Sequence, residues 1–194
     1  MSNKFKILAI DGGGFRGAYS AHLLKRVEEE FNVDWRKDFD LLAGTSTGSI
    51  IAACLAMGKN ANEVRGLYAK HGREIFNKPL VPRLGLLASK YQNYGLRSIL
   101  NDFFGKTKLG DIETPLMIPA TDIGNGCVHV FKSTYHNKFF RDKNVLVADA
   151  VLASCSAPTF FSPTLLPGDK PYLLADGGLW ANSPSLAAAF DAKH

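Results

Sequence analysis

The sequence predicts an α/β protein with three layers, in which helices cover both faces of a mainly parallel central sheet. Two apolar segments, 5–10 and 39–43, have the length and composition of buried strands. An amphipathic helical pattern follows the first segment, and a pattern over 47–57 that is apolar nearly all round follows the second. A strand followed by a helix, twice in succession, is typical of a parallel sheet with helices on both faces.

The remaining chain continues with further helices and strands. The first helix is expected to place four apolar residues on its buried face, Leu23, Leu24, Val27 and Phe31. A third helix is expected to begin near Asn60, because Asn60 and Glu63 have the spacing of a reciprocal helix cap. Later helices are predicted over 96–104, 145–153 and 184–190, and strands over 115–120, 128–132 and 172–175. A chain of this length favours one catalytic domain over 5–194.

The segment 77–94 interrupts this pattern. Pro79, Pro82 and Gly85 disfavour a helix, and apolar residues alternate here with basic ones. One interpretation is a surface loop with a short helix that packs against the core. The other is a lid or membrane-contact insertion, because apolar and basic side chains together suit the surface of an anionic membrane.

Composition excludes several classes of function. A net charge of +5 is too small for an extended nucleic-acid-binding surface, but it is compatible with anionic lipids and phosphate-bearing ligands. The three cysteines have no CxxC spacing, which favours reduced thiols and a cytoplasmic protein. The sequence shows no signal segment and no run of about 18 apolar residues. It also shows no cluster of His or carboxylate ligands, so neither a metal nor an organic cofactor is expected.

A nucleophile elbow is predicted at Gly44-Thr45-Ser46-Thr47-Gly48, between an apolar strand and a buried helix. In such a turn the backbone bends sharply, and glycines at both ends remove the clashes that Cβ atoms would cause. The hydroxyl of Ser46 would then stand at a helix N-terminus, where the helix dipole favours the negative charge of an attacked carbonyl.

A glycine-rich loop follows the first strand. Consecutive amides of Gly12, Gly13 and Gly14 can point into one concavity and bind an anion at the start of a helix, with Arg16 beside them. Gly12, Gly14 and Gly17 also satisfy the dinucleotide-binding pattern G-x-G-x-x-G, which has little specificity by itself.

Asp176 ends the last predicted strand and is followed by Gly177 and Gly178, which form the predicted base turn. A Ser–Asp–His hydrolase of this chain order would need a histidine after the acid, and only His194, at the terminus, has that order. We therefore predict a Ser–Asp dyad in which Asp176 takes the proton of Ser46 directly. An aspartate is a weak base, so the dyad requires a secluded carboxyl with a raised pKa.

Three ordered motifs resemble the signatures of the patatin-like phospholipases: Asp11-Gly-Gly-Gly-Phe-Arg16-Gly17, Gly44-Thr-Ser46-Thr-Gly48 and Asp176-Gly-Gly178. Supporting segments at 119–122, 153–158 and 178–184 match as well, so the resemblance covers roughly residues 5 to 186. The family implies an α/β/α fold and a lipid acyl hydrolase of the phospholipase A type, with Ser46 as nucleophile and Asp176 as base. It also implies an oxyanion hole made by the amides of Gly12–Gly14, with Arg16 supporting the loop.

The resemblance also implies partners. A phospholipid or other acyl-ester lipid would be the substrate, at a membrane surface with which the cytoplasmic protein associates peripherally. Similarity over 7–57 to bacterial members that cyclic nucleotides activate implies a small regulatory nucleotide. The family's catalytic domain commonly continues beyond the point that corresponds to His194, which implies a C-terminally shortened form.

Two other interpretations stay open on the sequence alone. One is a dinucleotide-binding oxidoreductase that uses the G-x-G-x-x-G loop. The other is a catalytically silent module that binds a lipid or a nucleotide.

Overall fold

The computed structural model describes residues 4–76, 92–167 and 171–193. Of the segment 77–94, in which a lid was predicted, residues 77–91 lie outside the described residues and residues 92–94 begin α4. Within the described parts of the chain, no helix is long and apolar enough to cross a bilayer.

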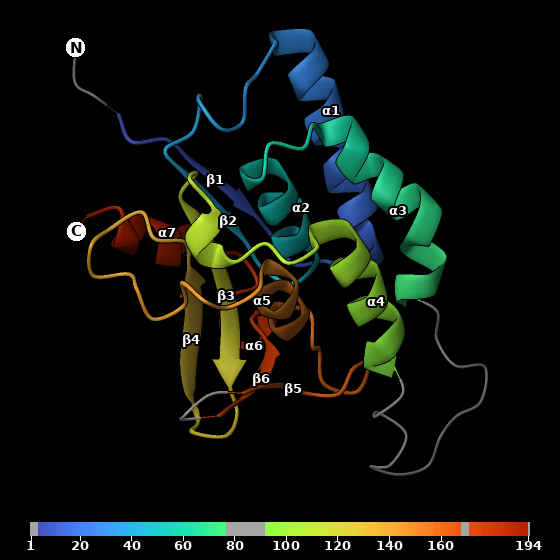
Figure 1. The fold of residues 1–194 in the computed structure, drawn as a ribbon. Helices are drawn as coiled ribbons and strands as arrows, with labels where there is room; N and C mark the ends of the chain where they lie inside the picture. Colours follow the sequence, from blue (N-terminus) through green and yellow to red (C-terminus); the bar gives the residue numbers. More distant parts are fainter. Residues whose placement is uncertain (1–3, 77–91, 168–170, 194) are drawn as a thin grey trace.

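Six strands form one sheet (Figure 1). The strands β1 (Ile7–Ile10), β2 (Leu41–Gly44) and β3 (Leu116–Asp122) are parallel, with β1 at one edge of the sheet and β3 at its centre. Three antiparallel strands extend it: β4 (Cys127–Lys132) and β6 (Tyr172–Asp176) pair with β3, and β5 (Thr164–Leu166) pairs with β6. The short strand β5 was not predicted from the sequence, and the other five lie where strands were expected.

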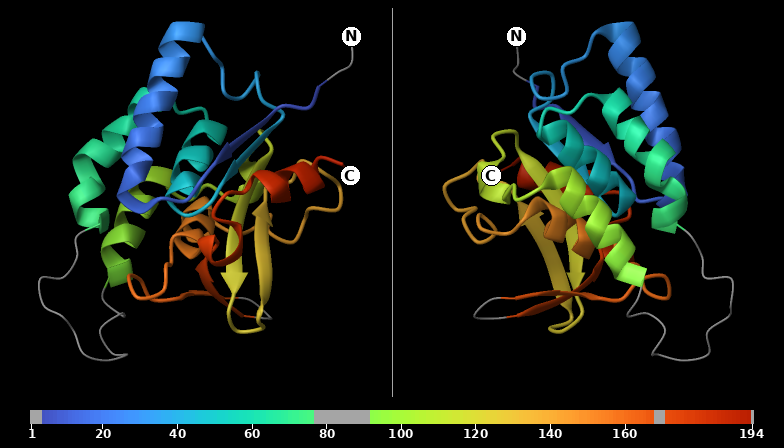
Figure 2. Two further views of the ribbon diagram at one scale, coloured as in Figure 1. Left: turned by 180° about the vertical axis from the view of Figure 1, so that it is seen from behind. Right: turned by 45° about the vertical axis from the view of Figure 1, so that its right-hand side comes forward.

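The sheet is covered unequally on its two faces. The larger core cluster joins one face to α1 (Gly17–Phe31), α2 (Thr47–Ala56), α3 (Ala61–Phe76), α4 (Gln92–Phe104) and α5 (Val147–Ser154). The helix α7 (Ser185–Asp191) packs on the other face, where Ala188 contacts a small cluster containing Leu41, Ala43 and Met117. In Figure 1, α5 lies to the right of β3 and α7 to its left, and the left-hand view of Figure 2 shows α7 from the other side. The predicted α/β/α class is confirmed.

The buried helix behind the elbow is present as predicted, and all ten residues of α2 are buried. The predicted cap of α3 is also present: the Asn60 N–H donates to Glu63 Oε2, and the Glu63 N–H donates to Asn60 Oδ1, both at 2.9 Å. The helix α7 is fixed to the end of β4 through its last residue, Asp191. Its carboxylate binds Lys132, which ends β4, and Tyr135, which follows β4.

The buried face predicted for α1 is partly wrong. Leu24 faces the core, but Leu23 is 50% exposed and Phe31 is 70% exposed. The predicted Val27 is partly buried against the core, and the buried residues are Gly17, Ala21 and Leu24, whose spacing makes a narrow stripe on one side of a helix. At Gly17 a Cβ atom would lie 2.7 Å from the hydroxyl of Tyr68, so this stripe of small residues lets α1 approach α3 closely.

Substitution of Gly48 should destabilise the protein, whereas the same substitution at Gly66 should stabilise it. A Cβ at Gly48 would lie 2.2 Å from Ile10 O, so β1 or α2 would have to move, at a cost of about 1–3 kcal/mol or more. Gly66 is an exposed position in α3 with open space around its Cα, where alanine is better by roughly 0.5–1 kcal/mol. Denaturant unfolding of Gly48→Ala and Gly66→Ala measures both effects. Equal midpoints for the two variants would contradict the close approach of β1 and α2.

Candidate active site

The strands β2 and β6 meet end to end along the same side of β3. Residues Leu42 and Ala43 of β2 pair with Leu116 and Met117, and β6 pairs with β3 only from Ala120 onward. Pro119, which cannot donate a ladder hydrogen bond, lies between the two pairings. Because β6 runs antiparallel to β3, its carboxyl end faces the carboxyl end of β2 across this gap. Ser46, just after the end of β2, and Asp176, the last residue of β6, are therefore brought together.

The backbone of Ser46 has φ 53° and ψ −126°, a conformation that non-glycine residues rarely adopt. Glycines on both sides allow the turn: a Cβ at Gly44 would lie 2.2 Å from Gly48 O. The turn connects β2 directly to α2, as the elbow prediction requires. The side chain of Ser46 thus stands at the first turn of a buried helix.

The Ser46 hydroxyl donates to Asp176 Oδ2 at 2.7 Å. The other carboxylate oxygen, Oδ1, accepts the Gly178 N–H at 2.6 Å. Asp176 is only 6% exposed, and burial raises the pKa of this carboxyl, although the hydrogen bonds from Ser46 and Gly178 act in the opposite direction. A carboxylate with a raised pKa in contact with a serine hydroxyl can accept its proton.

The glycine loop lies against the elbow, and its three amides differ in what they bind. The Gly12 N–H donates to Asn182 O at 2.9 Å, and the Gly13 N–H makes a longer bond of 3.2 Å to Thr47 Oγ1. The Gly14 N–H has no acceptor among the described residues. Gly14 has φ 56°, which glycine adopts without strain. The exposed Arg16 donates from Nε to Gly13 O at 3.4 Å and so contacts the loop that it was expected to support.

The short helix α6 (Gly178–Ala181) follows β6 directly and binds both the elbow and β3. Its carbonyl at Ala181 accepts the buried Thr45 hydroxyl at 2.7 Å, next to the nucleophile. The indole of Trp180 donates to Ala120 O on β3 at 2.9 Å. Gly177 allows the close approach, because a Cβ there would lie 2.3 Å from Pro119 O. The base turn therefore holds the elbow, the glycine loop and β3 in one arrangement.

Two residues at the site were not singled out by sequence reasoning. Ser154, the last residue of α5, accepts the Ser46 N–H, and Asn182 accepts the Gly12 N–H through its carbonyl. Both lie within the supporting segments 153–158 and 178–184, which resemble the family but contain no group of obvious chemical reactivity. The similarity of these two segments to the family was the signal in the sequence that could have pointed to Ser154 and Asn182.

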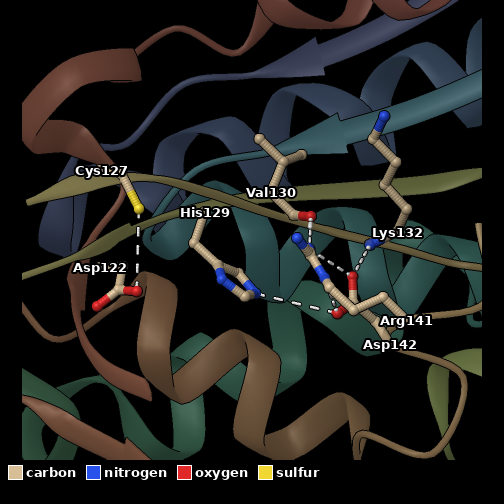
Figure 3. Close-up of polar contacts among 7 residues, drawn as sticks. All are labelled: Asp122, Cys127, His129, Val130, Lys132, Arg141 and Asp142. Atoms are coloured by element: carbon tan, nitrogen blue, oxygen red, sulfur yellow. Dashed lines mark hydrogen bonds and ion pairs between the residues drawn. The ribbon is translucent and has the colours of Figure 1, made fainter. Parts of the chain in front are cut away.

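His129, on β4, is buried, and its ring contacts Phe131 and Tyr172 and not Ser46. Its ring packs between Phe131 and Tyr172, with centroid distances of 4.4 and 4.8 Å. Its Nε2 atom points toward Asp142 Oδ1, 4.0 Å away, and that carboxylate is held by Arg141 (Figure 3). Burial, and secondarily the charge of Arg141, lowers the pKa of His129 to about 4. At neutral pH this histidine is an uncharged part of the core.

No group of three or more His, Cys, Asp or Glu side chains that could hold a metal ion occurs in the described parts of the chain.

A broad hollow of about 930 Å³ lies beside Trp35, Arg36 and Lys59, around the loops that precede β2 and α3. It does not include Ser46 or Asp176.

Comparison with known proteins gives one consistent family. The model of the family "Patatin-like phospholipase" matches residues 8–189. A "cGAMP-activated phospholipase" of Pseudomonas aeruginosa is 34% identical over 192 residues, which are 97% of this chain and 57% of that protein. A "cUMP-AMP-activated phospholipase" of Escherichia coli is also 34% identical, over 98% of this chain and 59% of its own length. "Patatin-like protein 1" of Arabidopsis thaliana is 32% identical, over 94% and 50%.

The fold is similar to that of a solved structure, VipD from Legionella pneumophila, with a TM-score of 0.58 and 15% identity. The similarity covers 90% of this chain and 46% of that one. This chain thus spans between half and three fifths of the length of these curated relatives.

Replacement of Asp176 by asparagine should raise the melting temperature more at high pH than at low pH. Below the unfolded-state pKa the carboxyl is protonated in both states, but as pH rises through the raised folded-state pKa, the native protein must hold a buried charge and loses stability. Asparagine retains an acceptor for Gly178 and carries no charge. The melting temperatures of the wild type and of Asp176→Asn are to be measured at about pH 3, below the ordinary aspartate pKa of 3.8, and at about pH 8. If the melting temperatures of the two proteins differ by the same amount at both pH values, the raised pKa of Asp176 is contradicted.

Proposed function

Because this chain belongs to the patatin-like phospholipase family, we propose that it hydrolyses fatty-acyl esters of phospholipids through a Ser–Asp dyad. Ser46 is the nucleophile of this proposal and Asp176 its general base. The observation that supports it most directly is the 2.7 Å hydrogen bond from Ser46 Oγ to Asp176 Oδ2. Two groups that are 130 residues apart in the chain meet at the distance that proton transfer needs.

In the first half of the proposed reaction, Ser46 Oγ attacks the ester carbonyl carbon while its proton moves to Asp176 Oδ2. The carbonyl oxygen becomes the oxyanion of a tetrahedral intermediate. The intermediate then expels the alcohol, which takes the proton back from Asp176, and an acyl-enzyme remains on Ser46. In the second half, a water oxygen attacks the acyl carbon while its proton moves to Asp176. The bond from the acyl carbon to Ser46 Oγ then breaks, Oγ takes the proton back from Asp176, and the fatty acid leaves.

The oxyanion would be held mainly by the amides of Gly13 and Gly14. The Gly14 N–H is without an acceptor in the described structure, and the bond from the Gly13 N–H to Thr47 Oγ1 is long enough to be exchanged. The Gly12 N–H, included in the oxyanion hole on sequence grounds, is bonded to Asn182 O and would anchor the loop. Fixed amides in a secluded site stabilise developing negative charge strongly.

A lipid substrate agrees with the exposed apolar side chains next to the site segments. Phe15 follows the glycine loop and is 58% exposed, and Leu179 and Trp180 follow the base turn. Phe160 follows the turn that contains Ser154. We propose that these side chains contact acyl chains or the surface of a membrane, with which the protein associates peripherally in the cytoplasm.

The names of the bacterial relatives suggest regulation. Two of them are described as activated by cGAMP and by cUMP-AMP. We propose a small nucleotide of this type as a regulator of the present protein as well. The dinucleotide-binding oxidoreductase is not favoured, because the family model covers the glycine loop, the elbow and Asp176 together.

Ser46→Ala should abolish both fatty-acid release and labelling by a fluorophosphonate, since the nucleophile is lost; a decrease of at least about 10³-fold is expected. Ser98→Ala, at an exposed position of α4, is the matched control and should retain both. Release of fatty acid from phospholipid vesicles and mass spectrometry of the labelled protein measure the outcome. A label that persists in Ser46→Ala would falsify the assignment of the nucleophile. Vesicle binding by the wild type without any hydrolysis would instead indicate a catalytically silent lipid-binding module.

The pH dependence of kcat/KM should show an acid limb that belongs to Asp176. Only the ionised carboxylate accepts the serine proton, so activity should rise as pH increases through the pKa of Asp176. Burial places that pKa above the ordinary aspartate value of 3.8, and the midpoint of the limb should be displaced upward accordingly. An acid limb at or below 3.8 would argue against Asp176 as the base.

A further inference from the structure

The conformation of Ser46 has to be enforced by its surroundings. Its φ of 53° and ψ of −126° are unfavourable for a residue with a Cβ, and such a conformation persists only where neighbouring contacts over-determine it. The residues on either side are held by backbone bonds: the Thr45 N–H donates to Ile10 O, and the Gly48 N–H donates to Thr45 O. The amide of Ser46 itself is held by a side chain.

That side chain is Ser154, which is fully buried at the end of α5. Its hydroxyl oxygen accepts the Ser46 N–H at 2.9 Å, and its proton goes to Pro119 O at 2.6 Å. Pro119 pairs with Val130 of β4 on one side of β3, and on the other side it lies at the gap between β2 and β6, where Ser154 binds its carbonyl. A single hydroxyl therefore satisfies the two backbone groups that the gap would otherwise leave unpaired.

The turn that follows Ser154 also holds the base. The Asp176 N–H donates to Ser156 O at 3.0 Å, and the Gly177 N–H donates to Ser154 O at 3.3 Å. The tripeptide Ser154–Ser156 is thus hydrogen-bonded to the backbone of the nucleophile through a side chain and to the backbone of the base through a carbonyl. A rigid segment bonded to both fixes their separation.

We propose that Ser154 is a positioning residue that sets the Ser46–Asp176 geometry and thereby the rate of acylation; this inference rests on the proposed function of those two residues. Without its hydroxyl, the peptide of Ser46 is free to turn toward a more relaxed conformation, which moves Oγ away from Asp176. Ser154 contacts the backbone of the nucleophile and not the lipid. Its loss should therefore decrease kcat and leave KM nearly unchanged.

Ser133, which follows β4, provides a matched control because its hydroxyl also binds backbone groups at β3. It is equally buried, accepts the Leu116 N–H at 2.9 Å, and donates to Thr114 O at 3.2 Å. Like Ser154, Ser133 therefore accepts one backbone N–H and donates to one backbone carbonyl, but it does so at the start of β3, away from Ser46. Ser133→Ala removes the same buried hydroxyl and the same two backbone bonds, so it reports the purely structural effect of that change.

The experiment measures the rate of fluorophosphonate acylation of Ser46, with kcat and KM for ester hydrolysis, in Ser154→Ala and Ser133→Ala, normalised to the folded fraction by circular dichroism. We expect acylation and kcat to fall by roughly 10–100-fold in Ser154→Ala, as a displacement of about 1 Å at a reacting group does, with KM within about twofold. Ser133→Ala should lose thermal stability but acylate at the wild-type rate per folded molecule.

Equal acylation rates in the two variants would overturn the proposal, as would a rise in KM with kcat unchanged. If Ser154→Ala does not fold, Ser154→Cys decides: the thiol nearly keeps the volume but bonds weakly, and a reduced acylation rate in folded protein is expected. A wild-type rate in Ser154→Cys would then overturn the proposal. Failure of the wild type to be labelled at Ser46 would reject the proposed function instead, so the two failures are distinguishable.

Discussion

The arrangement of this site depends on how the neighbours of β3 are divided. The first residues of β3 pair with β2 and the last three pair with β6, and these two strands approach each other from opposite directions. Their carboxyl ends meet beside Pro119, a residue that cannot extend either ladder. The proposed nucleophile lies just after the end of β2, and the proposed base is the last residue of β6. Their contact is therefore a consequence of strand pairing.

Close backbone approach is the second constraint on the site. Gly44, Gly48 and Gly177 each face a carbonyl oxygen at a distance that no Cβ atom could tolerate. These glycines let α2 and the base turn lie directly against β1 and β3. Three backbone carbonyls at this junction each accept a hydrogen bond from a side chain. Thr45 donates to Ala181 O, Ser154 to Pro119 O and Trp180 to Ala120 O.

Two features of the site lower the stability of the folded protein. Ser46 adopts an unfavourable backbone conformation, and Asp176 has a raised pKa because burial outweighs its two hydrogen bonds. Both features are retained by the dense core behind them, in which every residue of α2 and nearly every residue of α5 is buried. A reactive pair of this kind requires such a scaffold, because a looser one would relax the elbow and hydrate the carboxylate.

Sequence by itself determined the order of elements, the α/β/α class and the chemical identity of the groups at the strand ends. Apolar periodicity sufficed for most helices and strands, and the motif around Ser46 sufficed for the elbow, because both patterns are local. The sequence did not predict that Leu23 and Phe31 are exposed. It also did not predict the strand β5, whose three residues are too few to show a pattern. Only the tertiary structure decided that β6 runs against β3, that Ser154 binds the amide of Ser46, and that Asn182 occupies the amide of Gly12. These contacts join residues far apart in the chain, and their partners are backbone atoms, which every residue has and which no sequence pattern distinguishes.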